Sequence, residues 1–142
     1  MGFDINLEWD APSHDPVARS RRAANALLAA VHGLTEFPLD SAVIAKAIGV
    51  PVAEVWDHWF HVELHAHDAL AGALVHLSTD SGTVELQSNP PGGCAAALAA
   101  VGPLLAALAS NGLHVVDPNG LLAEYEAQRT RVLKVAEMAR DL

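Results

Sequence analysis

The segment from Phe60 to His67 restricts the fold more than any other part of the chain, because apolar and polar residues alternate along it without interruption. The apolar positions are Phe60, Val62, Leu64 and Ala66, and the polar positions are His61, Glu63, His65 and His67. A period of two is the pattern of a β-strand with one buried and one exposed face. The sequence therefore predicts a strand that displays three histidines and a carboxylate on its open side.

A helix through the same residues is the alternative, because residues 53–59 already have a helical pattern. In one continuous helix the polar stripe would consist of Asp57, His61, His65 and Asp68. We favour a helix that ends near Trp59 and is followed by a strand. Phe60 and Val62 have good β-propensity, and the next segment has the pattern of a hairpin partner.

The length of 142 residues predicts one domain, and the formal net charge of −9 argues against nucleic acid or an anionic membrane as the partner. No run of about 18 apolar residues is free of helix breakers: Cys94–Ala109 comes nearest, but it is too short and contains Gly102 and Pro103. The N-terminus lacks the pattern of a signal peptide. Cys94 is the only cysteine, so no disulfide within the chain is expected. We therefore predict a cytoplasmic protein that does not enter a membrane.

The remaining patterns predict a mixture of strands and helices, with Thr35–Asp40 as a loop and Asp15 as the N-cap of the first helix. The expected strands are residues 3–9, 60–66, 73–78, 83–87 and 113–116, and the expected helices are residues 16–32, 41–48, 51–59, 94–110 and 121–142. Gly102-Pro103 is expected to kink the fourth of these helices or to split it in two.

This order of elements predicts an α+β domain over residues 1–142, with a helical insertion at about residues 39–59. Its sheet would be antiparallel, with four to five strands, helices on one face and the split β-α-β plan of ferredoxin-like domains. The other face would be acidic and rich in histidine. Its expected outward residues are Asp4, Asn6, Glu8, His61, Glu63, His65, His67, Glu85 and Gln87.

A metal site is one hypothesis for this face, because His65 and His67 form a His-x-His pair on one side of a strand. His61 or Glu63 would be a third ligand and Asp68 a fourth, for zinc or another divalent transition metal. The set is not one of the His-Glu-x-x-His zinc signatures, and it includes no cysteine. We therefore predict that the protein purifies without stoichiometric metal, and a metal-binding protein or metal-dependent enzyme is the alternative.

Two other hypotheses receive less support from the sequence. Ala45–Trp59 has the spacing of a helix-turn-helix unit, but its second helix offers Glu54, Asp57 and His58 in place of side chains that contact base edges. A transcriptional regulator is thus a weaker alternative. Cys94 follows two glycines and His114 lies on a later strand, which would suit a nucleophilic pair. We favour the simpler interpretation of Cys94 as a small apolar residue in a first helical turn. We predict no catalytic residue.

The two ends of the chain resemble a known group of proteins. Phe3-Asp4-Ile5 at the start, and a helix followed by the sequence from Gly112 to Pro118, resemble a broad set of small bacterial α+β proteins, some assigned as immunity proteins of polymorphic toxin systems. The resemblance covers the first strand and the last third of the chain, and the insertion at Ala45–Trp59 departs from it. It implies a cytoplasmic binding protein of antitoxin type, with no catalytic residue to carry over.

The sequence thus favours a non-enzymatic interaction protein that masks a basic protein partner with its acidic sheet face, although a homodimer is also compatible with the chain. The predicted contact residues are Asp4, Glu8, His61, Glu63, His65, His67 and Glu85.

Overall fold

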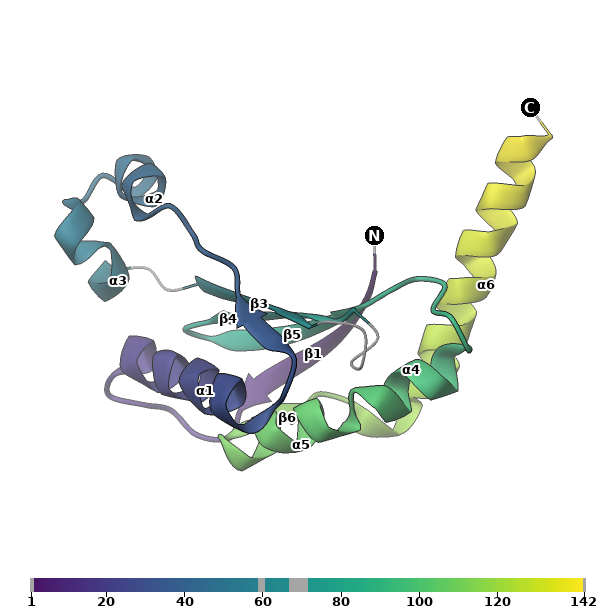
Figure 1. Cartoon of the computed structure of the whole chain (residues 1–142), viewed down its shortest axis with the longest axis horizontal. Helices are drawn as coiled ribbons and strands as arrows, with labels where there is room; N and C mark the ends of the chain where they lie inside the picture. The colour runs from purple at the N-terminus through teal and green to yellow at the C-terminus, as the bar shows by residue number, and fades with distance from the viewer. Residues whose placement is uncertain (1, 59–60, 67–71, 142) are drawn as a thin grey trace.

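The computed structural model describes residues 2–58, 61–66 and 72–141 and shows an α+β fold with an antiparallel sheet of six strands (Figure 1). The strands are β1 (Phe3–Trp9), β2 (Leu34–Glu36), β3 (His61–Ala66), β4 (Leu74–Ser78), β5 (Ser81–Leu86) and β6 (Leu113–Val115). The helices are α1 (Pro16–Ala30), α2 (Ser41–Ile48), α3 (Val55–His58), α4 (Cys94–Ala100), α5 (Gly102–Ser110) and α6 (Leu121–Arg140), with short 3-10 helices η1 (Val52–Glu54) and η3 (Pro118–Gly120). The predicted fold class is confirmed, and the strand predicted at residues 60–66 is confirmed over His61–Ala66, whereas Phe60 lies outside the described residues.

The sheet has the strand order β2-β3-β4-β5-β1-β6, and every neighbouring pair is antiparallel. Its part β4-β5-β1-β6, together with α1 and the α4–α5 pair, follows the split β-α-β plan. Strands β2 and β3 extend that plan at the β4 side, and α2, η1 and α3 lie between them along the chain. β1, at the beginning of the chain, therefore lies between β5 and β6, which come much later in the sequence.

The strand count is the point at which the sequence prediction was wrong, because four to five strands were expected. Residues 35–40 were expected to form a loop, whereas Leu34–Glu36 forms β2 and pairs with β3. A segment of three residues is too short to show an alternating pattern, and only Leu34 in it is buried. The strand therefore depends on backbone pairing with β3, which is a tertiary contact.

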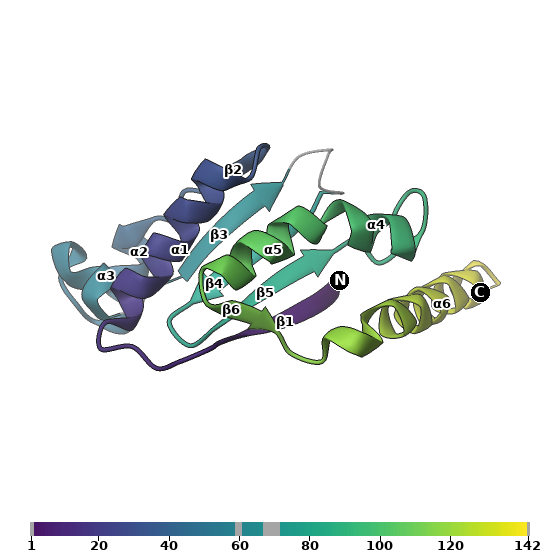
Figure 2. The ribbon, with the colours of Figure 1, turned by 90° about the horizontal axis from the view of Figure 1, so that it is seen from below.

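One face of the sheet forms the core. The inward side chains of β1, β3, β4 and β5 are buried, and α1, α4 and α5 cover them, as seen from below in Figure 2. Asp15 caps α1 as predicted, since its carboxylate accepts a hydrogen bond from the backbone N–H of Ala18 at 3.1 Å. The predicted break at Gly102-Pro103 separates α4 from α5.

The opposite face of the sheet has no helix layer of this kind. In Figure 1, α2 and α3 rise at one end of this open face and α6 rises at the other. Ala45 and Val55 are buried within the helical insertion, where α2 packs on η1 and α3. In the second half of the helix-turn-helix candidate, the 3-10 helix η1 passes directly into the single α-helical turn of α3, and Trp59 lies outside the described residues.

Helix α6 is anchored near its beginning. The ring of Tyr125 is fully buried and stacks on Phe3 with 4.5 Å between the centroids, and its hydroxyl donates a hydrogen bond to the carbonyl of Gln87. One turn later, Gln128 donates to the carbonyl of Gly2 at 2.9 Å. From residue 133 to residue 141 every side chain is exposed, so the second half of α6 extends away from the body of the protein (Figure 1).

Candidate functional site

The open face of the sheet concentrates acidic residues and histidines. The described strands contain no lysine or arginine. The outward residues of these strands include Asp4, Asn6 and Glu8 on β1, His61, Glu63 and His65 on β3, His76 on β4, Thr83 and Glu85 on β5, and His114 on β6. The chain's positive charges lie on α1, α2 and α6, so the open face itself is a negative surface.

Two carboxylates lie directly opposite each other on this face. The β1–β5 register pairs Asp4 with Glu85, and neither side chain has a cationic partner among the described residues. Directly opposed like charges destabilise an antiparallel pair. The register therefore places two acidic side chains side by side, and none of the described cations forms an ion pair with either one.

An acidic hollow lies next to this pair of carboxylates. Its volume is about 60 Å³, and Asp4 shares its lining with Asp117, which follows β6, and with Glu124 of α6. Asp117 has a left-handed backbone with φ of 51°, a conformation in which aspartate is one of the residues found more often. Three carboxylates from three separate elements thus border one hollow large enough for the end of a cationic side chain.

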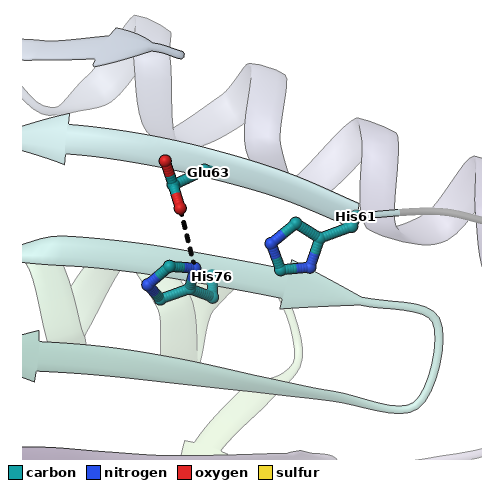
Figure 3. A group of neighbouring side chains, drawn as sticks. All are labelled: His61, Glu63 and His76. Atoms are coloured by element: carbon teal, nitrogen blue, oxygen red, sulfur yellow. Dashed lines mark ion pairs between the residues drawn. The ribbon is translucent and has the colours of Figure 1, made fainter. Parts of the chain in front are cut away.

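A second cluster lies on β3 and β4 and combines two imidazoles with a carboxylate. Figure 3 shows His61, Glu63 and His76 on the same side of the two strands. The Oε1 atom of Glu63 lies 3.4 Å from Nδ1 of His76, and the rings of His61 and His76 have 5.6 Å between their centroids. One ligand atom from each of the three side chains lies within 4.8 Å of the other two.

The sheet register brings these three residues together. Glu63 is directly opposite His76, whereas His61 is opposite Ser78 and therefore diagonal to His76. His61 and Glu63 are two residues apart on one strand, so both point outward. Diagonal neighbours on a sheet face remain within reach of long side chains, which explains the approach of the two imidazoles.

His65 contacts the cluster from its edge. Its Nε2 atom lies 2.9 Å from Oε2 of Glu63, and its ring stacks on Phe37 with 5.1 Å between centroids and an angle of 13°. Glu63 therefore contacts a different histidine with each of its two oxygens. Because a carboxylate contact and a ring contact both act on His65, its position relative to Glu63 is well defined.

The surroundings shift two pKa values in this cluster. The hydrogen bond with His65 lowers the pKa of Glu63, which burial partly opposes, and the charges of the neighbouring histidines lower it further. Burial lowers the pKa of His61, and the nearby His76 adds to this effect while Glu63 opposes it. At neutral pH the cluster thus holds an ionised carboxylate beside a neutral imidazole at position 61.

The residues predicted for partner binding occupy two areas of one face. Asp4, Glu8 and Glu85 lie on β1 and β5, whereas His61, Glu63 and His65 lie on β3. His67 and Asp68, which completed the predicted metal set, lie outside the described residues. The histidines in that set also differ in their contacts, because His65 pairs with Glu63 while His61 lies beside His76.

The sequence analysis did not include His76, Asp117 or Glu124 in any site. A signal for His76 was present, because buried Val75 and Leu77 flank it in the predicted strand and place it on the outward side. No comparable signal existed for Asp117 and Glu124. Their proximity to Asp4 depends on β6 pairing with β1 and on the direction in which α6 leaves the sheet.

Cys94 and His114 do not form a nucleophilic pair. The Cys94 thiol is buried, and burial raises its pKa, whereas an activated cysteine requires a lowered pKa. His114 instead contacts Asp10 through its Nδ1 atom near the exposed end of β1. The structure therefore gives neither residue the surroundings of a reacting group.

No protein-family model matches this chain, and neither curated proteins nor solved structures show a significant similarity to it. Within the described part of the chain, none of the helices combines the length and the apolar character needed to cross a membrane.

Proposed function

We propose that this protein is a non-enzymatic interaction protein of immunity or antitoxin type, which binds a basic protein partner through the open face of its sheet. The observation that carries this proposal is the opposed pair of Asp4 and Glu85, beside the hollow that Asp117 and Glu124 also border. A surface that retains uncompensated carboxylates at a cost in stability has the properties of a binding site for cations.

A lysine or arginine side chain from a partner fits both the charge and the size of this area. Its positive charge would relieve the repulsion between Asp4 and Glu85, and the hollow of about 60 Å³ would receive its end. The negative surface would also attract a basic partner over a distance before contact, which raises the association rate. Occupation of the open face would mask the basic surface of the partner, as an immunity protein does for a toxin.

Partner capture from the source cells tests this proposal. The untagged wild-type chain, the Glu85→Lys variant and the Glu137→Lys variant would each be immobilised, and the bound proteins identified and quantified by mass spectrometry. We expect a basic protein that the wild type and Glu137→Lys retain and that Glu85→Lys loses. Glu137 provides the matched control, because it is an exposed carboxylate on α6, away from the sheet. Equal capture by all three chains would contradict the proposal.

Self-association is the competing explanation for an acidic face. The second half of α6 carries Arg131, Lys134 and Arg140 with the exposed apolar residues Leu133 and Met138, so a second copy could supply a cationic segment. Sedimentation of the pure chain over a range of concentrations separates the two cases. A monomer that captures a basic protein supports the proposal. A dimer that Glu85→Lys dissociates would assign the face to a second copy.

We place this interaction in the cytoplasm, because the chain has a single cysteine, which is buried as a free thiol. The proposed mechanism requires neither a cofactor nor a bond-breaking step. The resemblance of the chain ends to small bacterial proteins of the immunity type is consistent with this assignment.

A further inference from the structure

The cluster of His61, Glu63 and His76 has a composition that partner binding does not explain, since imidazoles add little to the attraction of cations at neutral pH. We propose that these three residues bind a divalent transition metal ion, with zinc as the best match. This inference goes beyond the proposed interaction with a protein partner, and it can be tested with the isolated chain.

The ligand types and their spacing fit zinc. Two histidines and one carboxylate form a ligand set found in zinc proteins, in which a water or substrate occupies the fourth position. Tetrahedral zinc with bonds of about 2.0–2.2 Å separates its ligand atoms by about 3.3–3.5 Å. The Glu63 Oε1 to His76 Nδ1 distance of 3.4 Å already has this value. The ligand atom of His61 lies within 4.8 Å of the other two. In the proposed site a change in the His61 side-chain rotamer brings it to ligand distance.

The backbone that holds these ligands is a rigid part of the fold. β3 and β4 are interior strands of the sheet, and Val62, Leu64, Val75 and Leu77 on their inward side are buried in the core. Directly opposed positions on paired strands keep a fixed separation. The protein therefore positions Glu63 and His76 before any ion arrives, and it leaves the side chains partly exposed so that an ion can enter.

An outer shell is also present around the carboxylate. His65 contacts the second oxygen of Glu63 at 2.9 Å, and Phe37 stacks on the His65 ring. Ligating carboxylates in metal sites are usually held by such partners, which fix the orientation of the ligand. In this arrangement Glu63 contributes Oε1 to the metal while His65 holds Oε2, so His65 is a positioning residue and not a ligand.

This site differs from the one that the sequence suggested, because the hypothetical set of His61, His65, His67 and Asp68 followed a single strand. The ligand set in the structure consists of His61 and Glu63 on β3 and His76 on β4. Three partly exposed ligands with one open position form a weaker site than a closed structural zinc site with four protein ligands. Binding of added zinc is thus compatible with a protein that purifies without stoichiometric metal.

Isothermal titration calorimetry of the untagged full chain with zinc chloride, after removal of metal by a chelator, tests the proposal. We expect one ion per chain. The variants His61→Ala and His76→Ala should each weaken zinc binding at least tenfold, since loss of an outer-shell partner alone costs about 10–100-fold. His65→Ala should weaken it by about tenfold. Circular dichroism spectra identical to that of the wild type establish that each variant is folded.

His114→Ala is the matched control. His114 is also an outward histidine paired with a carboxylate, that of Asp10, but it has no third ligand in the described groups that could hold a metal. It should bind zinc like the wild type. Cobalt provides a second readout, because its visible absorption indicates the coordination geometry and should disappear with His76→Ala. Wild-type affinity in His76→Ala, an equal loss in His114→Ala, or no zinc binding by the wild type would each overturn the proposal.

Discussion

Glu85 has a local environment in which its charge lowers the stability of the sheet. It lies opposite Asp4 without a described cationic partner, and a lysine at position 85 would convert repulsion into attraction. We predict that Glu85→Lys raises the free energy of unfolding by about 0.2–1 kcal/mol, the range of cross-strand charge pairs. Urea unfolding measures this change, with Glu137→Lys as a control that should give no gain. A loss of stability in Glu85→Lys would show that Asp4 and Glu85 do not repel each other.

Tyr125 is the residue whose ionisation gives the clearest pH effect. Burial raises its pKa to about 12, against about 10 for an exposed tyrosine. Below pH 10 the phenol is protonated in the folded and the unfolded chain, so its contribution to stability is complete. Between pH 10 and 12 the unfolded chain releases this proton first, and stability falls on the order of 2 kcal/mol.

Two measurements check this prediction for Tyr125. It is the only tyrosine in the chain, so the ultraviolet absorbance of the phenolate reports its ionisation alone. We expect that absorbance to appear near pH 12 in the folded protein and near pH 10 in urea. Urea unfolding should show that Tyr125→Phe loses less free energy of unfolding than the wild type between pH 10 and 12, because it has no phenolic proton to release. Titration of the lysines affects both proteins equally. Ionisation near pH 10 in the folded protein would contradict the burial of the hydroxyl.

The residues of the candidate site could be predicted where one strand determines their orientation. Alternation alone placed His61, Glu63 and His65 on one face, because successive side chains of a strand point to opposite sides. Alternation does not give the register between strands. The contact of Glu63 with His76 depends on the register of β3 against β4. No short turn motif in the sequence between the two strands determines that register, so the cross-strand cluster could not be derived from the sequence.

At the scale of secondary-structure elements, most segments were predicted close to their observed ranges, including the short elements α2, β4, β5 and β6. β1, α1 and α6 agree closely with the expected ranges, because each contains enough residues to show its periodicity. β2 is the exception, because a loop was expected there, and the helix expected at residues 51–59 differs in that its first turn is the 3-10 helix η1. Both are short, and contacts with β3 or with α2 determine their form more than their own residues do.

The second half of α6 contributes little to the fold. Residues 133–141 are exposed, whereas Tyr125 and Gln128 anchor the first half on Phe3 and Gly2. We predict that truncation after Val132 changes the free energy of unfolding by less than about 1 kcal/mol, as expected for exposed positions. Truncation after Glu124 removes Tyr125 and should cost more than about 3 kcal/mol, as for other buried aromatic residues.

Urea unfolding of the two truncated chains at one protein concentration measures both effects. A large loss after truncation at Val132 would show that the exposed apolar residues of α6 are buried in solution, as they would be in a dimer. Sedimentation of the same sample would then show a change in mass. If the free energy of unfolding and the monomeric mass are both unchanged, the isolated fold does not require the part of α6 after Val132.

At the scale of the whole molecule, the lysines and arginines lie only on the helices, whereas acidic residues lie on both the strands and the helices. The chain carries 17 acidic and 8 basic side chains, and none of the basic ones lies on a described strand. A negative face of this kind steers a basic partner, so the association rate should fall as salt shortens the reach of the field to about 8 Å at physiological ionic strength. Dissociation should depend on salt much less.

The last prediction combines salt, pH and charge reversal in one stopped-flow experiment with the captured partner. Glu63→Lys and Glu85→Lys should slow association at neutral pH and low salt, and Glu137→Lys should not, because only the first two change the open face.

The same experiment tests the pH dependence of association. Protonation of all 8 histidines would cancel all but one of the 9 net negative charges. An ordinary histidine titrates near pH 6.5, and burial lowers the pKa of His61 further. Association should therefore slow as the pH falls from about 7 to about 5, with His61 among the last histidines to contribute. An association rate that is independent of salt, or an equal loss in all three variants, would show that the partner binds elsewhere on the molecule.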